Sequence, residues 1–257
     1  MNPVEIPSLP LGQAGFRLDF DGTVVYVDPY LSNRVAELEG ADLQRQIPIP
    51  EAPQDITDAS WILLSHIHLD HCDLATLLPM TRASAAARIM CPAEVARHLF
   101  ENGLPSQRLH EADEQWHQLG PGCRVIAVPA AHPDLERDAQ GLLRYAGYVI
   151  EYGGRRLYHA GDTSVHEEII ETLRAMGPID VAFLPVNERN FYRERRGIVG
   201  NMTVREAFQF ALDIRVRVMV PVHWDMFAPN AVYPEEIRLL YDLMRPAFEM
   251  RIRPERI

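Results

Sequence analysis

The sequence predicts a mixed α/β fold in which sheets are covered by helices. Short apolar runs bounded by turn residues are typical of buried strands, and they make up one part of the chain. Between them lie longer segments whose apolar residues recur every three or four positions, the period of an amphipathic helix. A length of 257 residues with 47% hydrophobic residues suits one large domain or two small ones with a sizeable core.

Strands come first along the chain. Residues 14–20 and 23–27 predict two strands joined by Asp21-Gly22, a dipeptide favoured in hairpins. The second strand ends at Asp28-Pro29-Tyr30, residues 40–59 predict a loop, and residues 61–64 predict a buried strand. Later apolar runs predict further strands at residues 124–128, 146–151, 156–159, 180–185 and 216–222.

Three segments predict helices. From Val204 an apolar stripe follows one helical face, and Thr203 with Glu206 forms a capping-box pattern at its start. Residues 165–176 place apolar residues on one face before the stop at Gly177-Pro178. Residues 235–245 show the same spacing, so strands and helices alternate as layered sheets require.

The composition argues against several classes of partner. The net charge is −11, whereas a protein that holds a nucleic-acid backbone usually has a basic face, so we expect no nucleic-acid partner. No apolar run reaches the roughly 18 residues of a membrane helix, and residues 1–7 lack a secretory pattern, so we expect no membrane partner. Three cysteines without a Cys-x-x-Cys pair fit a reducing compartment, and we expect a cytoplasmic protein.

The strongest chemical signal is the segment Ser65-His66-Ile67-His68-Leu69-Asp70-His71, directly after a predicted buried strand. In an extended or gently turning segment residues i and i+2 point the same way, so His66 and His68 can hold one metal ion. Asp70 and His71 follow where the chain turns and can face a second ion. Imidazole and carboxylate ligands together suit zinc, manganese or iron.

Three further candidate ligands lie where predicted strands end. His132 follows the strand at 124–128, Asp162 follows the strand at 156–159, and His223 closes the strand at 216–222. A single histidine or aspartate in such a place is more often structural. Together with the first motif, these residues form a set of seven ligands.

The order His-x-His-x-Asp-His, a later His, Gly-Asp-Thr and a last His resembles the metallo-β-lactamase superfamily over nearly the whole chain. The resemblance implies a four-layer αββα sandwich in a single domain over residues 1–257. It also implies two divalent metal ions, zinc or manganese with iron as an alternative. One would be held by His66, His68 and His132, the other by Asp70, His71 and His223, with Asp162 bridging them.

Two positions narrow this resemblance. His68 stands where flavodiiron relatives carry Glu, which favours hydrolysis over redox chemistry. Asp162 stands where the antibiotic-destroying β-lactamases carry Cys, which argues against antibiotic hydrolysis. Finer matches resemble the L-ascorbate-6-phosphate lactonase group, whose members often assemble into oligomers, so we expect a homo-oligomer. These matches lie at residues 157–162, 179–182, 200–203 and 220–225.

The expected chemistry is hydrolysis by a bridging hydroxide. Two cations about 3.5–4 Å apart lower the pKa of a shared water toward roughly 7, and we expect Asp70 to be the catalytic residue that orients it. The leading hypothesis is a hydrolase that opens a small cyclic, sugar-derived substrate, a lactone or a cyclic ketone. One alternative is a phosphodiesterase acting on a small anionic ester such as a cyclic nucleotide. Another is a metal-loaded binding module without enzymatic activity.

The segment 187–197 carries four arginines within eight residues of an acidic chain. Arginine binds phosphate or carboxylate in bidentate fashion, so one hypothesis is a clamp for a small anionic substrate. The expected substrate-binding residues are Asn187, Arg189, Arg193, Arg196 and Trp224. An equally weighted alternative is a solvated loop or a subunit contact.

Two neighbours of the candidate ligands are expected to support the site. His159 lies inside a predicted strand, which favours a core or supporting role over direct ligation. Asp225 follows His223 and is placed to orient the site.

Overall fold

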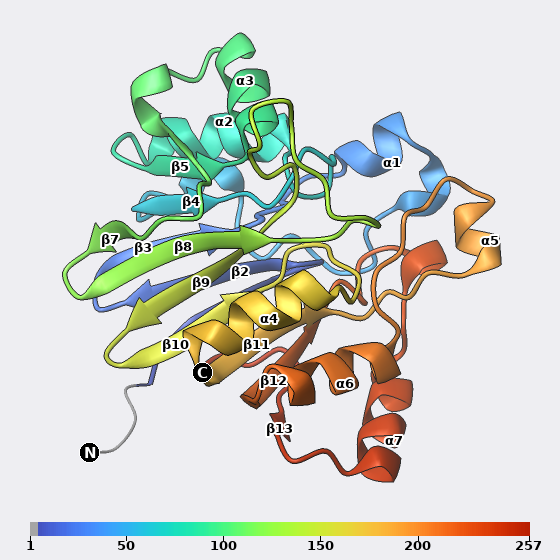
Figure 1. Cartoon of the computed structure of the whole chain (residues 1–257). Helices are drawn as coiled ribbons and strands as arrows, with labels where there is room; N and C mark the ends of the chain where they lie inside the picture. Colours follow the sequence, from blue (N-terminus) through green and yellow to red (C-terminus); the bar gives the residue numbers. More distant parts are fainter. Residues whose placement is uncertain (1–4) are drawn as a thin grey trace.

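The protein is a four-layer sandwich in which two sheets pack face to face and helices cover their outer faces (Figure 1). The structure is a computed structural model that describes residues 5–257. The expected αββα architecture is therefore confirmed. The first four residues, part of the segment expected to lack a secretory signal, lie outside the described residues.

The first sheet has six strands in chain order. Its first three strands are antiparallel, and β3 to β6 are parallel. The hairpin predicted around Asp21-Gly22 is confirmed as β2 and β3, and the run from Trp61 as β4. The strands are β1 (Ser8–Gly12), β2 (Gly15–Phe20), β3 (Thr23–Val27), β4 (Trp61–Leu63), β5 (Arg88–Cys91) and β6 (Leu109–Glu111).

The second sheet has seven strands, also in chain order. It is antiparallel from β7 to β10 and parallel from β10 to β13. All five strands predicted here are confirmed. The strands are β7 (His117–Gly120), β8 (Cys123–Pro129), β9 (Ala146–Tyr152), β10 (Arg155–His159), β11 (Ile179–Pro185), β12 (Val216–Val222) and β13 (Glu249–Met250).

The main core lies between the two sheets. Successive residues of a strand point to opposite faces, so Val25 and Val27 of β3 pack against Phe183 of the second sheet. Val24 and Tyr26 of the same strand face outward into a separate core beneath the helices. A strand buried on both faces must be apolar throughout, which is why the strand sequences read as continuous apolar runs.

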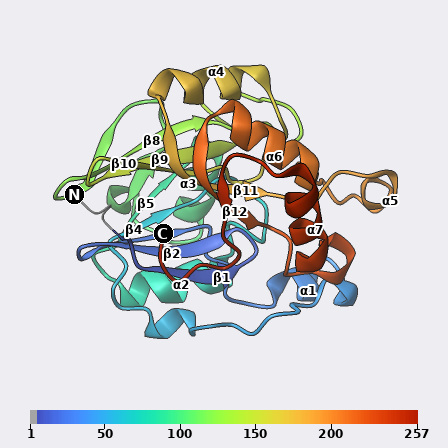
Figure 2. The ribbon, with the colours of Figure 1, turned by 90° about the horizontal axis from the view of Figure 1, so that it is seen from below.

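Helices cover both outer faces. α2 (Leu74–Ala83) and α3 (Ala93–Glu101) pack on the first sheet. α4 (Glu167–Met176), α6 (Val204–Asp213) and α7 (Pro234–Met244) pack on the second, as the view from below shows (Figure 2). The three predicted helices are thus confirmed, including the capping box of Thr203 and Glu206.

Two short helices lie beyond the layers at one end of the sandwich (Figure 1). They are α1 (Arg34–Leu38) and α5 (Phe191–Glu194). The predicted loop at 40–59 is largely irregular and contains the single 3₁₀ turns η1 (Ala41–Leu43) and η2 (Pro53–Asp55). Similar turns occur at η3 (Ser106–Arg108) and η4 (Ala228–Asn230).

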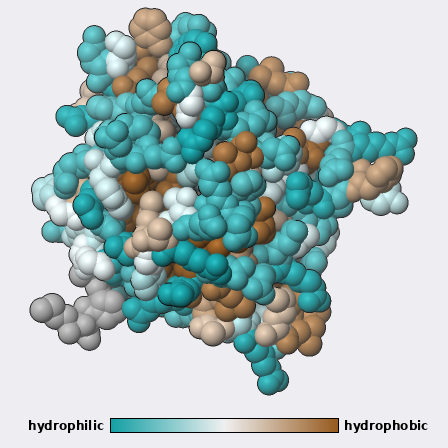
Figure 3. Space-filling model, viewed as in Figure 1, coloured by the Kyte–Doolittle hydropathy of each residue, from teal (hydrophilic) through white to brown (hydrophobic). Residues whose placement is uncertain are grey.

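The surface is mainly hydrophilic, with apolar residues in separate patches on the face shown in Figure 3. Within residues 5–257, no helix has the length and apolar character needed to cross a membrane. All three cysteines are buried and free.

Candidate metal centre

The seven predicted ligands meet at one end of the two sheets. Four of them lie between β4 and α2, and His132, Asp162 and His223 follow β8, β10 and β12. Their ligand atoms form three overlapping groups, within each of which the atoms lie no more than 4.8 Å apart. The groups are His66, His68 and His132; His66, His71 and Asp162; and Asp70, His71 and His223.

The segment that carries the first four ligands is a turn rather than an extended chain. The carbonyl oxygen of His68 accepts hydrogen bonds from the main-chain nitrogens of His71 (3.0 Å) and Cys72 (2.8 Å). The segment turns, which was one of the two shapes expected for it, and His66 and His68 lie in one group with His132. The turn itself brings the side chains together.

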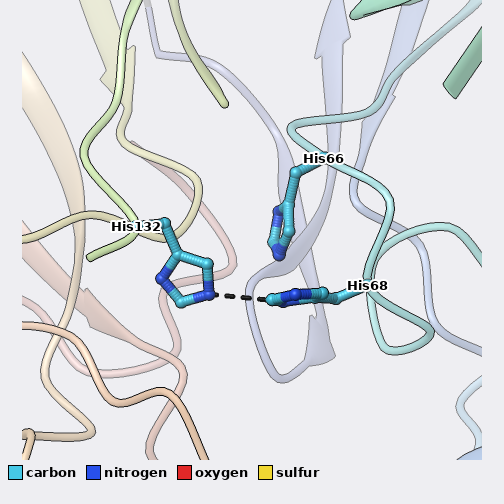
Figure 4. Close-up of side chains that lie close together, drawn as sticks. All are labelled: His66, His68 and His132. Atoms are coloured by element: carbon cyan, nitrogen blue, oxygen red, sulfur yellow. Dashed lines mark hydrogen bonds between the residues drawn. The ribbon is translucent and has the colours of Figure 1, made fainter. Parts of the chain in front are cut away.

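The first group contains imidazoles alone. His66, His68 and His132 point toward a common centre, with Nε2 of His132 3.3 Å from Nδ1 of His68 (Figure 4). Burial lowers the pKa of His66 well below its usual value and, with neighbouring histidines, lowers that of His132 to about 4. Both rings are therefore neutral near pH 7, the state in which histidine binds metal ions.

We call Asp70, His71 and His223 the second group. In this group, and in Asp162 beside it, imidazoles alternate with carboxylates. Nε2 of His223 lies 3.2 Å from Asp162 Oδ2 and 3.3 Å from Asp70 Oδ2, while Nε2 of His71 lies 3.4 Å from Asp162 Oδ1. Burial lowers the pKa of His71, but the surrounding carboxylates outweigh it and raise the pKa to about 9. The same balance raises the pKa of His223 to about 10.

Several buried polar atoms at the centre lack hydrogen-bond partners. Nε2 of His66, Nε2 of His71 and Oδ1 of Asp162 are the three that face one another. Leaving such an atom unsatisfied costs about 1–3 kcal/mol. A divalent cation would satisfy all three, and imidazole with carboxylate is a donor set that zinc, manganese and iron accept. The residues therefore fit divalent cations, which the overlapping groups of histidines and aspartates would hold.

Asp28, at the end of β3, supports the segment 65–71 through hydrogen bonds. Its Oδ2 accepts hydrogen bonds from Nδ1 of His71 (2.8 Å) and Oγ of Ser65 (2.7 Å), and its Oδ1 accepts one from the Ser65 main chain (2.8 Å). These bonds leave Nε2 of His71 facing the centre. From the sequence we placed Asp28 only at a strand end, although its position at the carboxyl end of a parallel strand was a usable signal.

His159 belongs to the core, as predicted. Its Nε2 lies 2.7 Å from the carbonyl oxygen of Ala14, and its Nδ1 accepts a hydrogen bond from Gly161. Asp225 also supports the site indirectly, because its Oδ1 accepts a hydrogen bond from the main chain of Gln13 (3.0 Å). Gln13 contacts two candidate ligands directly and was missed in the sequence.

A cavity of about 350 Å³ opens above the centre. Candidate ligands form its floor, and apolar side chains from two distant segments form much of its wall. The lining residues are Val35, Glu39, Leu43, His68, Asp70, His132, Asp162, Arg196, Gly197, Ile198, Val199, His223, Phe227 and Asn230.

Of the five expected substrate-binding residues, Arg196 alone lines this cavity, and it forms an ion pair with Asp42. The guanidinium of Arg193 instead donates to the carbonyl oxygens of Glu188, Pro229 and Ala231 and so fastens the loop. The side chain of Trp224 is buried and donates to the carbonyl oxygen of Pro221.

The remaining two residues also lie outside the cavity lining. Asn187 is buried in a chain of amides with Asn201 and Asn230. Arg189 is absent from the lining residues. The side chains of Phe191 and Tyr192 in α5 are exposed.

The fold and the centre together define an αββα sandwich with a candidate two-metal site at the ends of its strands. Residues 23–224 match the family model of the beta-lactamase superfamily domain. The chain therefore belongs to the β-lactamase superfamily, as its motifs indicated.

Several named proteins are similar to this chain in sequence or in fold. A protein of Thermococcus onnurineus named UPF0173 metal-dependent hydrolase is 27% identical over 235 residues, which cover 90% of this chain and 89% of the relative. The solved structure of Igni18, a metallo hydrolase from Ignicoccus hospitalis, aligns with a TM-score of 0.73 at 19% identity, covering 99% of this chain and 98% of that one.

A third protein, the isothiocyanate hydrolase from Delia radicum gut bacteria, aligns with a TM-score of 0.75 at 16% identity, covering 98% of this chain and 97% of that one. At such identities the two solved structures show the shared fold alone. These three relatives give no support to the finer resemblance to the lactonase group.

Proposed function

We propose that this protein is a metal-dependent hydrolase that opens a small, uncharged cyclic carbonyl compound, a lactone or a cyclic ketone. The observation that carries the proposal is the convergence of seven histidine and aspartate ligands at the floor of a partly apolar cavity. The name of the Thermococcus onnurineus relative, a metal-dependent hydrolase, agrees with this reaction class.

The residues at the cavity floor suit hydrolysis. Two divalent cations, when bound, would lower the pKa of a coordinated water toward about 7 and polarise a carbonyl oxygen. Asp70 lines the cavity, and although burial raises its pKa, His71 and His223 lower it well below the usual range. Its carboxylate is therefore ionised and can accept a hydrogen bond from water, which orients that water toward a substrate.

The cavity walls favour an uncharged substrate. The apolar side chains of the lining, which offer surface to a small ring, include Val35, Ile198, Val199 and Phe227. The one arginine of the lining, Arg196, is already paired with Asp42. A sugar phosphate or a cyclic nucleotide would meet no unpaired cationic side chain among these lining residues, so we rank the phosphodiesterase alternative lower.

The proposal is tested with protein loaded with Zn²⁺ or Mn²⁺. Initial rates are compared on neutral five- and six-membered lactones, on a matched phosphorylated sugar lactone, and on bis-p-nitrophenyl phosphate. We expect turnover of a neutral lactone to exceed that of both anionic compounds. Faster hydrolysis of the phosphodiester, or of the phosphorylated lactone, would contradict the proposal. The His68→Ala protein serves as the control for trace hydrolase contamination.

Three expectations about the surroundings of the protein stay predictions. They are a homo-oligomeric state, a cytoplasmic location and the absence of a nucleic-acid partner. Size-exclusion chromatography with light scattering tests the first of them directly.

A further inference from the structure

Gln13 is a buried side chain that contacts two candidate ligands of one group. Its Nε2 donates a hydrogen bond to Asp70 Oδ2 at 2.6 Å and lies 3.1 Å from His223 Nε2. The residue is 4% exposed and lies in the turn between β1 and β2. Asp70 and His223 belong to the group that also contains His71, whereas the group of His66, His68 and His132 makes no such contact with Gln13 in the structure from residue 5 onward.

The main chain of the same turn holds His223. The His223 nitrogen donates to the carbonyl oxygen of Gln13 (2.8 Å), and the Gln13 nitrogen donates to Oδ1 of Asp225 (3.0 Å). His223 has a φ of +60°, a left-handed conformation that costs a non-glycine residue about 1–3 kcal/mol unless its surroundings impose it. The turn therefore fixes an otherwise unfavourable conformation at a candidate ligand.

The turn is itself confined by close packing. Gly12 has a φ of +89°, and a Cβ atom there would meet the side chains of Ile47 and Met226. On the other side of Gln13, Oδ2 of Asp225 receives a hydrogen bond from Arg253 (2.7 Å). The main chain of Gln13 is thus anchored by its neighbours on both sides. Its side-chain amide is therefore held in position next to Asp70.

The direction of the side-chain contact follows from charge. Asp70 is an ionised carboxylate that can only accept, so the atom of Gln13 that faces it is the amide nitrogen. A single residue thus fixes a histidine through its main chain and a carboxylate through its side chain. The two ligands come from segments 153 residues apart (223 − 70) and would otherwise be set only by the packing of the two sheets.

We propose that Gln13 is a positioning residue for the second cation, the one assigned to Asp70, His71 and His223. It sets Asp70 and His223, two of the candidate ligands of that cation, at their mutual spacing before the cation arrives. Partners that orient metal ligands typically contribute 10–100-fold to metal affinity. The inference rests on the two-cation site of the proposed function but is independent of the substrate.

The test separates the two cation positions by substitution. His132→Ala disables the first group, and His223→Ala disables the second, so each background retains one position. Gln13→Asn is then added to each background. In the His132→Ala protein it tests the second position, and in the His223→Ala protein it tests the first. Asparagine tolerates the left-handed conformation of the turn but is one methylene too short to reach Asp70.

Zn²⁺ affinity of the chelator-treated proteins is measured by isothermal titration. We expect Gln13→Asn to weaken binding about tenfold or more at the second position and to leave the first within about twofold. Asn201→Ala, which removes a buried amide that bonds to Asn187, is the matched control and should move neither affinity. Gln13→Met provides the same comparison if the asparagine variant does not fold, as judged by circular dichroism.

The outcomes are distinguishable. An equal effect of Gln13→Asn on both positions, or no effect on either, overturns the role of Gln13 while leaving the two-cation site intact. Absence of Zn²⁺ binding in both single backgrounds and in the unsubstituted protein would overturn the proposed site and this inference together.

Discussion

The protonation of each histidine at the candidate metal centre follows from what its ring faces. Burial disfavours the charged form of all four buried rings. His66 and His132 lie among other imidazoles, so burial prevails and their pKa values are lowered. His71 and His223 face carboxylates, which reverse the effect and raise their pKa values. The centre therefore holds protons where the second cation would bind.

Cation binding should release protons near pH 7. With pKa values of about 9 and about 10, His71 and His223 are both protonated there without metal, and each must lose its proton to become a ligand. We expect release of about two protons per chain, falling as the pH rises through these pKa values. Zn²⁺ titration in buffers of different ionisation enthalpy measures this number. Uptake without proton release would contradict the assigned roles of His71 and His223.

Turnover should depend on Asp70 and His68. Asp70→Ala removes the ionised carboxylate that lines the cavity, and His68→Ala removes a ligand of the first group. We expect each change to lower kcat/KM by at least about 100-fold, because loss of even a supporting partner of a metal ligand typically costs about 10–100-fold. Circular dichroism should show an intact fold. Normal turnover by metal-loaded Asp70→Ala protein would refute its assigned role.

At the scale of elements, the cavity wall comes from two segments that are distant in sequence. α1 and η1 supply Val35 and Leu43, and the loop after α5 supplies Ile198 and Val199. The ion pair between Asp42 and Arg196 links them across the opening. Both side chains of this pair are about half exposed, so water screens it and its contribution to stability is small.

Replacement of Arg196 and of Arg193 by methionine should have different effects on activity and on the stability of the loop. Arg196→Met breaks one exposed ion pair and should change kcat/KM on a neutral lactone by less than about fivefold. Arg193→Met breaks three hydrogen bonds to main-chain carbonyls from a half-buried position, a loss on the order of 2 kcal/mol to the loop. Hydrogen exchange of residues 187–199 measures that loss. A large loss of activity in Arg196→Met, confined to anionic substrates, would favour the clamp hypothesis.

The sequence predicted most of the elements that carry strong apolar patterns, although it missed β1, β5 and the amphipathic helix α3. Strands β8 to β12 are buried on both faces, and their continuous apolar runs made them visible. β6 and β7 are short and partly polar edge strands, β13 has two residues, and α2 contains Pro79, which favours an interrupted helix. Such elements are fixed by their neighbours in the fold rather than by local pattern.

The candidate ligands were predictable for a related reason. Each follows a strand end, and four of them are crowded into one short motif, so spacing alone pointed to them. Gln13 and Asp28 are single polar residues in turns and had no such spacing. Their roles arise from contacts with residues that lie 37 to 212 positions away in the sequence, which only the packed structure brings together.

At the scale of the whole molecule, the metal centre joins the two sheets. The ligands His66 to His71 follow β4 of the first sheet, whereas His132, Asp162 and His223 follow strands of the second. The overlapping ligand groups each combine residues from both sides of the sandwich. A cation held by such a group would cross-link the sheets at this end of the sandwich, and it would favour the folded arrangement.

Removal of metal should therefore destabilise the entire domain. A ligand present at about 1,000 times its dissociation constant stabilises the folded state by about 4 kcal/mol, and 1 kcal/mol shifts Tm by about 2–4 °C in a domain of this size. We expect chelation to lower Tm by roughly 8–16 °C, with recovery on adding Zn²⁺. The doubly substituted His66→Ala, Asp162→Ala protein, which lacks a ligand of each cation, is the control and should show little response. In unsubstituted protein, hydrogen exchange should rise on chelation at the ends of β4, β8, β10 and β12 together, because one cross-link holds both sheets. An increase confined to one sheet would contradict this coupling.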